Sequence, residues 1–215
     1  MRPALTLVTD AALCGSRGLA ATVRHAVQGG VTTVQLRDKH GTASAQLAEL
    51  DRLATVIDGR ADLLVNDRLD VALAARERGL PVAGVHLGQG DAGVRQARAE
   101  LGPDAIVGLT ANTAAHLAAV AALPAHTVDY LGVGVIRPTV TKPDHPTPLG
   151  VPGFRDFAAA TALPCVAIGG IRRSDVGPLR AAGAAGIAVV SALCAAADPE
   201  TAARQLRAAW QGVSR

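Results

Sequence analysis

Residues 33–39 read Thr-Val-Gln-Leu-Arg-Asp-Lys, a β-branched and apolar run that ends in charged side chains. The same design recurs along the chain, where polar groups follow apolar runs at residues 66–67, 86–91, 139–142 and 169–170. Short apolar runs of this kind are typical of strands that are covered on both faces, as in a parallel sheet. Parallel strands that all carry polar groups at their carboxyl ends form one site at the mouth of a (β/α) barrel.

Eight apolar runs alternate with segments of helical spacing. We expect strands at residues 5–9, 33–36, 63–65, 84–87, 106–109, 130–134, 165–168 and 186–190. We expect helices at residues 18–28, 43–57, 69–78, 93–101, 113–123, 153–162, 175–182 and 199–210, with Ser174 as the N-cap of the seventh. Eight strand–helix units predict an α/β protein that is a single (β/α)8 TIM barrel over residues 1–215. An open, doubly wound sheet is the alternative, but the glycine-rich turn expected after its first strand is missing.

The composition narrows the classes of function. A hydrophobic content of 49% over 215 residues supplies a large core without disulfides. The 21 basic residues are scattered and are not interleaved with aromatic ones, so the net charge of +3 does not indicate nucleic-acid binding. Three widely spaced cysteines favour a reducing compartment, and we expect a cytoplasmic protein. The uncharged stretch at residues 181–197 is too short for a membrane span, and we interpret it as a helix end, a turn, a buried strand and a loop.

The end of the second expected strand carries three polar side chains in alternation. The period of two places Gln35, Arg37 and Lys39 on one side of the strand and Leu36 and Asp38 on the other. Arg37 offers a planar fork for a phosphate group, and Lys39 offers a point charge. We therefore expect an anionic, phosphorylated ligand at this position.

Acidic residues follow the third and fourth expected strands. Asn66 and Asp67 come directly after one strand and Asp91 after the next, although each could instead cap the following helix. Two carboxylates that share ligand phosphates and waters are a typical arrangement for Mg²⁺. His86 lies within the fourth strand, where no HxH or HxxxH spacing supports zinc, so we interpret it as a buried or supporting histidine.

Further candidates follow the later strands. Thr110 ends the fifth strand, and the proline-rich segment 137–152 is long enough to be a lid that closes over phosphate groups. Glycines such as Gly170 let main-chain N–H groups approach phosphate oxygens, and the loops after strands seven and eight are the usual phosphate site of a barrel. A plain turn or a solvated loop is the alternative for each segment.

Seven segments in order make the chain resemble the thiamine phosphate synthase family over nearly its whole length. They are VQLRDK (34–39), VNDRLDVALA (65–74), GVHLGQGD (84–91), GLT (108–110), PTVTK (138–142), AIGGI (167–171) and VVSA (189–192). The resemblance implies a TIM-barrel transferase that requires Mg²⁺. It implies two small-molecule substrates, 4-amino-2-methyl-5-hydroxymethylpyrimidine diphosphate and hydroxyethylthiazole phosphate. In that family pyrophosphate leaves first, and the thiazole nitrogen then captures the pyrimidine-methyl cation.

The resemblance also implies roles for individual residues. The pyrimidine diphosphate should be bound by Gln35, Leu36, Arg37, Asp38, Lys39, Asn66 and Thr110. Mg²⁺ should be held by Asp67 and Asp91, and the catalytic groups should be Arg37, Lys39, Thr110 and Lys142. The thiazole phosphate should be held by the segment Thr139, Val140, Thr141 and Lys142, together with Gly170, Val190 and Ser191.

The chain departs from the family pattern at two positions of the expected site. Val135, Ile136 and Arg137 stand where the family usually has a proline and an aromatic residue, and we expect Arg137 to add a phosphate contact. Thr110 stands where the family usually has serine. Two other functions stay open, a thiazole tautomerase-like isomerase and a non-catalytic barrel that binds thiamine phosphate. These patterns favour no membrane partner and leave open a homo-oligomer.

Overall fold

Eight parallel strands form a closed barrel in the part of the chain that the computed structural model describes, which is residues 4–89, 93–139, 141 and 147–212. The strands are β1 (Leu5–Val8), β2 (Thr33–Leu36), β3 (Asp62–Asn66), β4 (Val82–Leu87), β5 (Ile106–Thr110), β6 (Tyr130–Gly134), β7 (Cys165–Ile168) and β8 (Gly186–Val189). Each strand pairs with the next, and β1 pairs with β8. The TIM barrel is therefore confirmed, and the open sheet is excluded.

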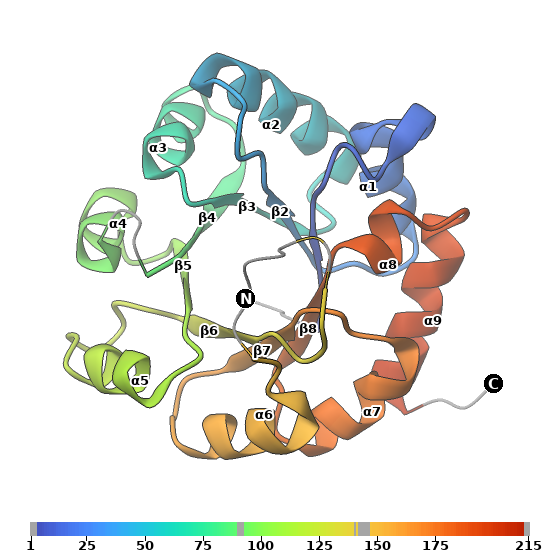
Figure 1. Ribbon diagram of the computed structural model, residues 1–215. Coiled ribbons are helices and arrows are strands. Elements are labelled where there is room, and N and C mark those ends of the chain that lie inside the picture. Colours follow the sequence, from blue (N-terminus) through green and yellow to red (C-terminus); the bar gives the residue numbers. More distant parts are fainter. Residues whose placement is uncertain (1–3, 90–92, 140, 142–146, 213–215) are drawn as a thin grey trace.

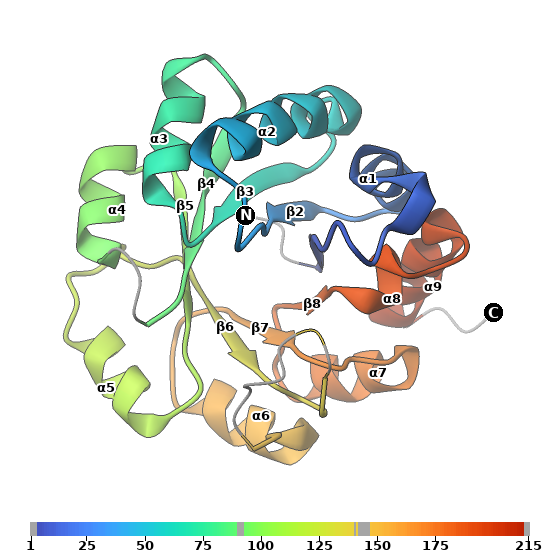
Figure 2. The ribbon, with the colours of Figure 1, turned by 45° about the horizontal axis from the view of Figure 1, so that its top comes forward.

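Helices surround the barrel (Figure 1). They are η1 (Gly15–Arg17), α1 (Leu19–Gln28), α2 (Ala43–Ile57), α3 (Leu69–Glu77), α4 (Val94–Leu101), α5 (Ala114–Ala121), α6 (Gly150–Ala159), α7 (Arg173–Ala181), α8 (Ser191–Cys194) and α9 (Pro199–Gln211). The view in Figure 2 shows the same ring of helices from a second angle, with α8 and α9 next to α1. Among the described helices, none combines the length and apolarity needed to cross a bilayer.

Two local predictions are wrong. Ser174 does not cap α7, because Arg172 is the N-cap residue and the Asp175 carboxylate accepts a hydrogen bond from the Arg172 N–H at 2.9 Å. An acidic residue in the first turn satisfies a main-chain donor that would otherwise lack an intrahelical partner. The segment after β8 is also not a plain loop, because it forms the short helix α8.

The core has two layers. Apolar side chains between the helices and the sheet form the larger layer, which includes Phe154, Leu50 and Leu131 at 0% exposure. A smaller cluster fills the inside of the barrel and consists of Val8, Leu64, Tyr130, Val166 and Ala188. This inner cluster closes the barrel below its carboxyl end, so the polar groups above it line a pocket rather than a channel.

Candidate active site

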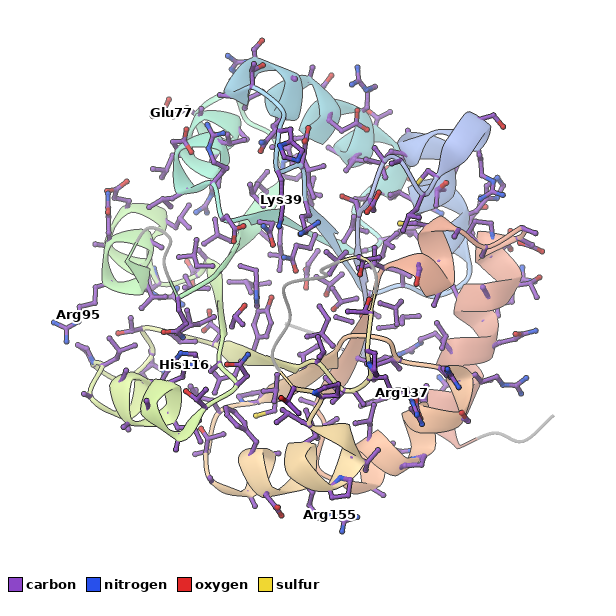
Figure 3. The ribbon with its side chains drawn as sticks, in the orientation of Figure 1. Lys39, Glu77, Arg95, His116, Arg137 and Arg155 are labelled. Carbon is purple, nitrogen blue, oxygen red and sulfur yellow. The ribbon has the colours of Figure 1, made fainter. Side chains whose placement is uncertain are left out.

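A cavity of about 310 Å³ lies at the carboxyl ends of the strands and takes lining residues from all eight of them. Most of the residues that the sequence predicts for the site line this cavity. They are Gln35, Arg37, Lys39, Asn66, Asp67, Thr110, Thr139, Thr141, Gly170, Val190 and Ser191. Asp91, Val140 and Lys142 lie outside the described residues. Figure 3 shows Lys39 within the ring of helices, whereas Glu77, Arg95 and Arg155 lie on its outer rim.

Leu36 and Asp38 are not among the residues that line the cavity. Leu36 is 2% exposed and packs in the core outside the barrel. The Asp38 carboxylate accepts hydrogen bonds from the N–H groups of His40 and Gly41, so it organises the turn before α2. Both side chains lie on the opposite face from Gln35 and Arg37, as the period of two requires.

The ends of β2 and β3 are tied together by side chains. The Gln35 amide donates a hydrogen bond of 2.6 Å to Asn66 Oδ1, and Gln35 is 5% exposed. The main chain of Asp67 is left-handed, with φ of 64°, and its N–H donates to the His86 carbonyl at 2.8 Å. A non-glycine residue with positive φ is uncommon outside turns and functional sites. The backbone therefore holds Asp67 at the cavity that Arg37 and Lys39 also line.

The ends of β4 and β5 meet through His86. Its Nδ1 lies 2.8 Å from the hydroxyl of Tyr130, and its Nε2 lies 3.1 Å from the hydroxyl of Thr110. Burial raises the pKa of the Tyr130 phenol, which therefore keeps its proton at neutral pH. The Gln89 side chain donates to the Thr110 carbonyl at 2.6 Å and so fixes the end of β5 from the β4 side.

Arg137 has a different partner from the one expected. Its guanidinium donates two hydrogen bonds to the carboxylate of Asp175, from Nε at 2.8 Å and from Nη2 at 2.6 Å. The Asp175 side chain is 5% exposed, and Arg137 (labelled in Figure 3) does not line the cavity. The Arg137 guanidinium beside Asp175 holds the pKa of that carboxyl below its usual range. The planar edge of the guanidinium that was expected to contact a phosphate is here occupied by a bidentate ion pair with Asp175.

A glycine turn after β7 contributes main chain to the β6–β8 side of the cavity. Gly169 and Gly170 have φ of 98° and 63°, and the Gly169 carbonyl accepts a hydrogen bond from the Arg137 N–H at 3.0 Å. A Cβ atom at Gly170 would lie 2.8 Å from the Pro138 carbonyl oxygen. Glycine is required here because the loop after β6 lies directly on the turn after β7. The hydroxyls of Thr139 and Thr141 lie 2.9 Å apart beside this turn.

The sequence interpretation missed several residues of the cavity. Tyr130, Thr6 and Val8 line it from inside the barrel, and Asn112 lines it from the loop after β5. The signal for Tyr130 was present, because it alternates with Gly132 and Gly134 along an inward-facing strand. The position of Asn112 could not be predicted in this way, because side chains in a loop do not alternate regularly between two faces.

The comparisons with known proteins agree with this geometry. A family model described as "Thiamine monophosphate synthase" matches residues 5–193. The chain belongs to this family. It is 45% identical to a thiamine-phosphate synthase of Psychrobacter sp. (strain PRwf-1) over 94% of this chain and 92% of that protein. It is 47% identical to a thiamine-phosphate synthase of Xanthobacter autotrophicus (strain Py2) over 95% of this chain and 94% of that one.

A solved structure supports the same assignment. The thiamine phosphate pyrophosphorylase of Pyrococcus furiosus aligns with a TM-score of 0.83 and 30% identity, over 99% of this chain and 97% of that chain. The match to the family model therefore includes all eight strands of the barrel. In this chain, one cavity is lined by Arg37, Lys39, Asp67 and the glycine turn at residues 169–170.

Proposed function

We propose that this chain condenses 4-amino-2-methyl-5-hydroxymethylpyrimidine diphosphate with hydroxyethylthiazole phosphate, which gives thiamine phosphate and pyrophosphate. The observation that carries the proposal is the joint lining of one cavity by Arg37 and Lys39 on one side and by Gly170 and Ser191 on the other. Two cations suit a diphosphate, and a glycine turn suits the single phosphate of the second substrate. The transferase class and the role in thiamine biosynthesis follow from the family.

The residues on the β2–β5 side suit a reaction in which the leaving group departs first. A leaving diphosphate develops negative charge, and cations already in place stabilise that charge without reorganisation. Arg37 and Lys39 supply this stabilisation, Lys142 adds to it, and Thr110 donates a hydrogen bond. Gln35 and Asn66, already joined by a hydrogen bond, hold the pyrimidine, while Leu36 and Asp38 contribute main-chain contacts within the same segment. No nucleophilic side chain is needed, because the thiazole nitrogen attacks the carbon that pyrophosphate leaves.

The donor set fits Mg²⁺. Asp67 offers carboxylate oxygens at the cavity from a main chain held in a left-handed conformation, and Asp91 is the second ligand by family resemblance. The described residues contain no group of three or more His, Cys, Asp or Glu side chains placed to hold a metal. Mg²⁺ is commonly bound by one or two carboxylates together with substrate phosphates, whereas zinc is usually bound by three or four protein ligands. When bound, Mg²⁺ would neutralise part of the diphosphate charge.

The second substrate belongs on the β6–β8 side. Thr139 and Thr141 line the cavity together with the glycine turn at Gly170, and Val190 and Ser191 line it from the end of β8. Val140 is assigned to the same phosphate by family resemblance alone. Main-chain N–H groups and hydroxyls can hold a phosphate without a buried cation. The substrates are small molecules, and we expect the reaction in the cytoplasm.

A two-substrate turnover assay with and without Mg²⁺ tests the proposal. We expect thiamine phosphate and pyrophosphate to appear in equal amounts and only when Mg²⁺ is present. Isomerisation of a thiazole phosphate without coupling would move the function to a tautomerase. Binding of thiamine phosphate without any turnover would make the barrel a binding protein.

A further inference from the structure

We propose that Tyr130 and His86 are positioning residues, which orient the Thr110 hydroxyl so that its hydrogen points toward the diphosphate of the substrate. The inference rests on the proposed function, because it takes the cavity to hold that anion. It assigns a task to two residues inside the barrel that the contacts expected of the substrate do not include.

The three groups form a continuous chain across three neighbouring strands. Tyr130 begins β6, His86 lies near the end of β4, and Thr110 ends β5 between them. The hydroxyl of Tyr130 is 2.8 Å from His86 Nδ1, and His86 Nε2 is 3.1 Å from Thr110 Oγ1. Both distances are those of hydrogen bonds.

The buried end of this chain fixes its direction. Tyr130 is 4% exposed, and among the described residues His86 is the hydrogen-bond partner of its hydroxyl. A buried donor without an acceptor is costly, so the phenol donates to His86 Nδ1. A neutral imidazole that accepts at Nδ1 carries its proton at Nε2 and donates there. Thr110 Oγ1 therefore accepts from His86, and its own hydrogen is directed elsewhere.

The barrel interior leaves room for these two rings at glycines. A Cβ atom at Gly108 would lie only 2.3 Å from Tyr130 Cζ, and one at Gly132 would lie 2.8 Å from His86 Cε1. A larger residue at either glycine would displace a ring of the chain. The centroids of the Tyr130 and His86 rings are 5.4 Å apart and their planes are tilted by 36°, so the rings pack as well as bond.

The consequence appears at the cavity. All three residues line it, and Thr110 is the one at the carboxyl end of its strand, where the proposed function puts the substrate. A threonine hydroxyl that already accepts one hydrogen bond is a better defined donor, because its rotation is limited. The fixed donor then stabilises negative charge that develops on the diphosphate as the bond to carbon breaks.

A double-mutant cycle in the full-length enzyme separates this role from simple packing. Tyr130→Phe keeps the ring and removes the hydroxyl, and we expect kcat to fall about 10-fold, the loss typical of an outer partner, with KM nearly unchanged. Thr110→Val removes the donor at similar volume. In the Thr110→Val background we expect Tyr130→Phe to change kcat by less than about 2-fold, since coupled residues are not additive.

Two further variants serve as a rescue and as a control for the cycle. Thr110→Ser restores the hydroxyl and should restore the sensitivity to Tyr130→Phe. Thr55→Val, on the exposed face of α2, is the control for loss of a threonine hydroxyl and should leave turnover unchanged. An equal fall in kcat for Tyr130→Phe with and without the Thr110 hydroxyl would overturn the proposal, and so would no fall at all.

The tautomer of His86 gives a readout that does not depend on turnover. Nitrogen-15 chemical shifts of the His86 ring should show an unprotonated Nδ1 and a protonated Nε2 in the wild-type protein. Tyr130→Phe should change that distribution, whereas Thr55→Val should not. A proton on Nδ1 in the wild-type protein would overturn the proposed chain of hydrogen bonds from Tyr130 to Thr110, even if the enzyme proved inactive with both substrates. Inactivity with the expected tautomer would instead count against the proposed function alone.

Discussion

The two sides of the cavity are built differently. On the β2–β5 side, side chains bond to one another, as Gln35 does with Asn66 and His86 does with Thr110. On the β6–β8 side, the turn at Gly169 and Gly170 presents main chain to the cavity, and the nearby Arg137 is held in an ion pair with Asp175. The first side can respond to charge that changes during a reaction, whereas the second offers a fixed shape for a phosphate group.

The difference gives a general expectation for substitutions. Changes on the β2–β5 side should lower kcat more than they alter substrate affinity, because the charge they stabilise develops mainly in the transition state. Changes on the β6–β8 side should raise KM for the thiazole phosphate and lower folding stability, because they disturb the shape of the main chain. The following substitutions test that contrast, from the largest expected effect to the smallest.

Asp67→Asn should have the largest effect. Asparagine tolerates the left-handed main chain at this position, so the fold is kept while the metal-binding charge is lost. We expect kcat to fall by about 10³-fold, at the upper end of the range for one electrostatic group. Asp70→Asn is the matched control, since Asp70 is an exposed acid three residues away that pairs with Arg68. Equal losses in the two variants, measured by steady-state turnover, would contradict the metal assignment.

Lys142→Ala should have the next largest effect. The ammonium group is expected to neutralise the departing pyrophosphate, and its loss should lower kcat by about 10²-fold. The matched control is Arg155→Ala, which removes a cation from the outer rim of the barrel (Figure 3). A Lys142→Ala enzyme with unchanged kcat would remove this residue from leaving-group stabilisation.

Gly170→Ala tests the other side of the cavity. The left-handed main chain and the close Pro138 carbonyl both oppose a side chain, so we expect a loss of about 1–3 kcal/mol in the free energy of unfolding. KM for the thiazole phosphate should rise more than kcat falls. Gly177→Ala is the control, because that helical glycine has open space around it, and we expect a gain of about 0.5–1 kcal/mol. Denaturant unfolding and steady-state kinetics measure both quantities, and a purely kcat effect at Gly170 would weaken the contrast between the sides.

The Arg137–Asp175 ion pair should have the smallest effect on turnover, and its loss should be seen in the pH dependence of the free energy of unfolding. The pKa of Asp175 is lowered in the folded protein, so its contribution to stability is present above the unfolded pKa of about 3.9. That contribution is lost as the pH falls through the lower, folded pKa. Asp175→Asn should therefore flatten the fall in unfolding free energy below about pH 4, whereas Asp51→Asn on α2 should not. Unchanged acid dependence in Asp175→Asn would mean that the pair adds nothing to stability.

Sequence patterns predicted the barrel and the positions of most nominated side chains because both follow from strand periodicity. Alternation along β2 separated Gln35 and Arg37 from Leu36, and the structure has the same separation. Residue type alone could not predict that Arg137 would pair with a carboxylate 38 positions later, because that contact depends on how the β6 loop meets α7. The helix α8 was missed for a similar reason, since four residues give no periodic signal.

A structure of the enzyme with thiamine phosphate, pyrophosphate and Mg²⁺ tests the contrast between the two sides most directly. We expect the pyrophosphate and the metal to lie against Arg37, Lys39 and Asp67. We expect the phosphate of thiamine phosphate to accept hydrogen bonds from the main chain at Gly170 and Ser191. Pyrophosphate bound at the glycine turn, with the single phosphate beside Arg37, would contradict the account.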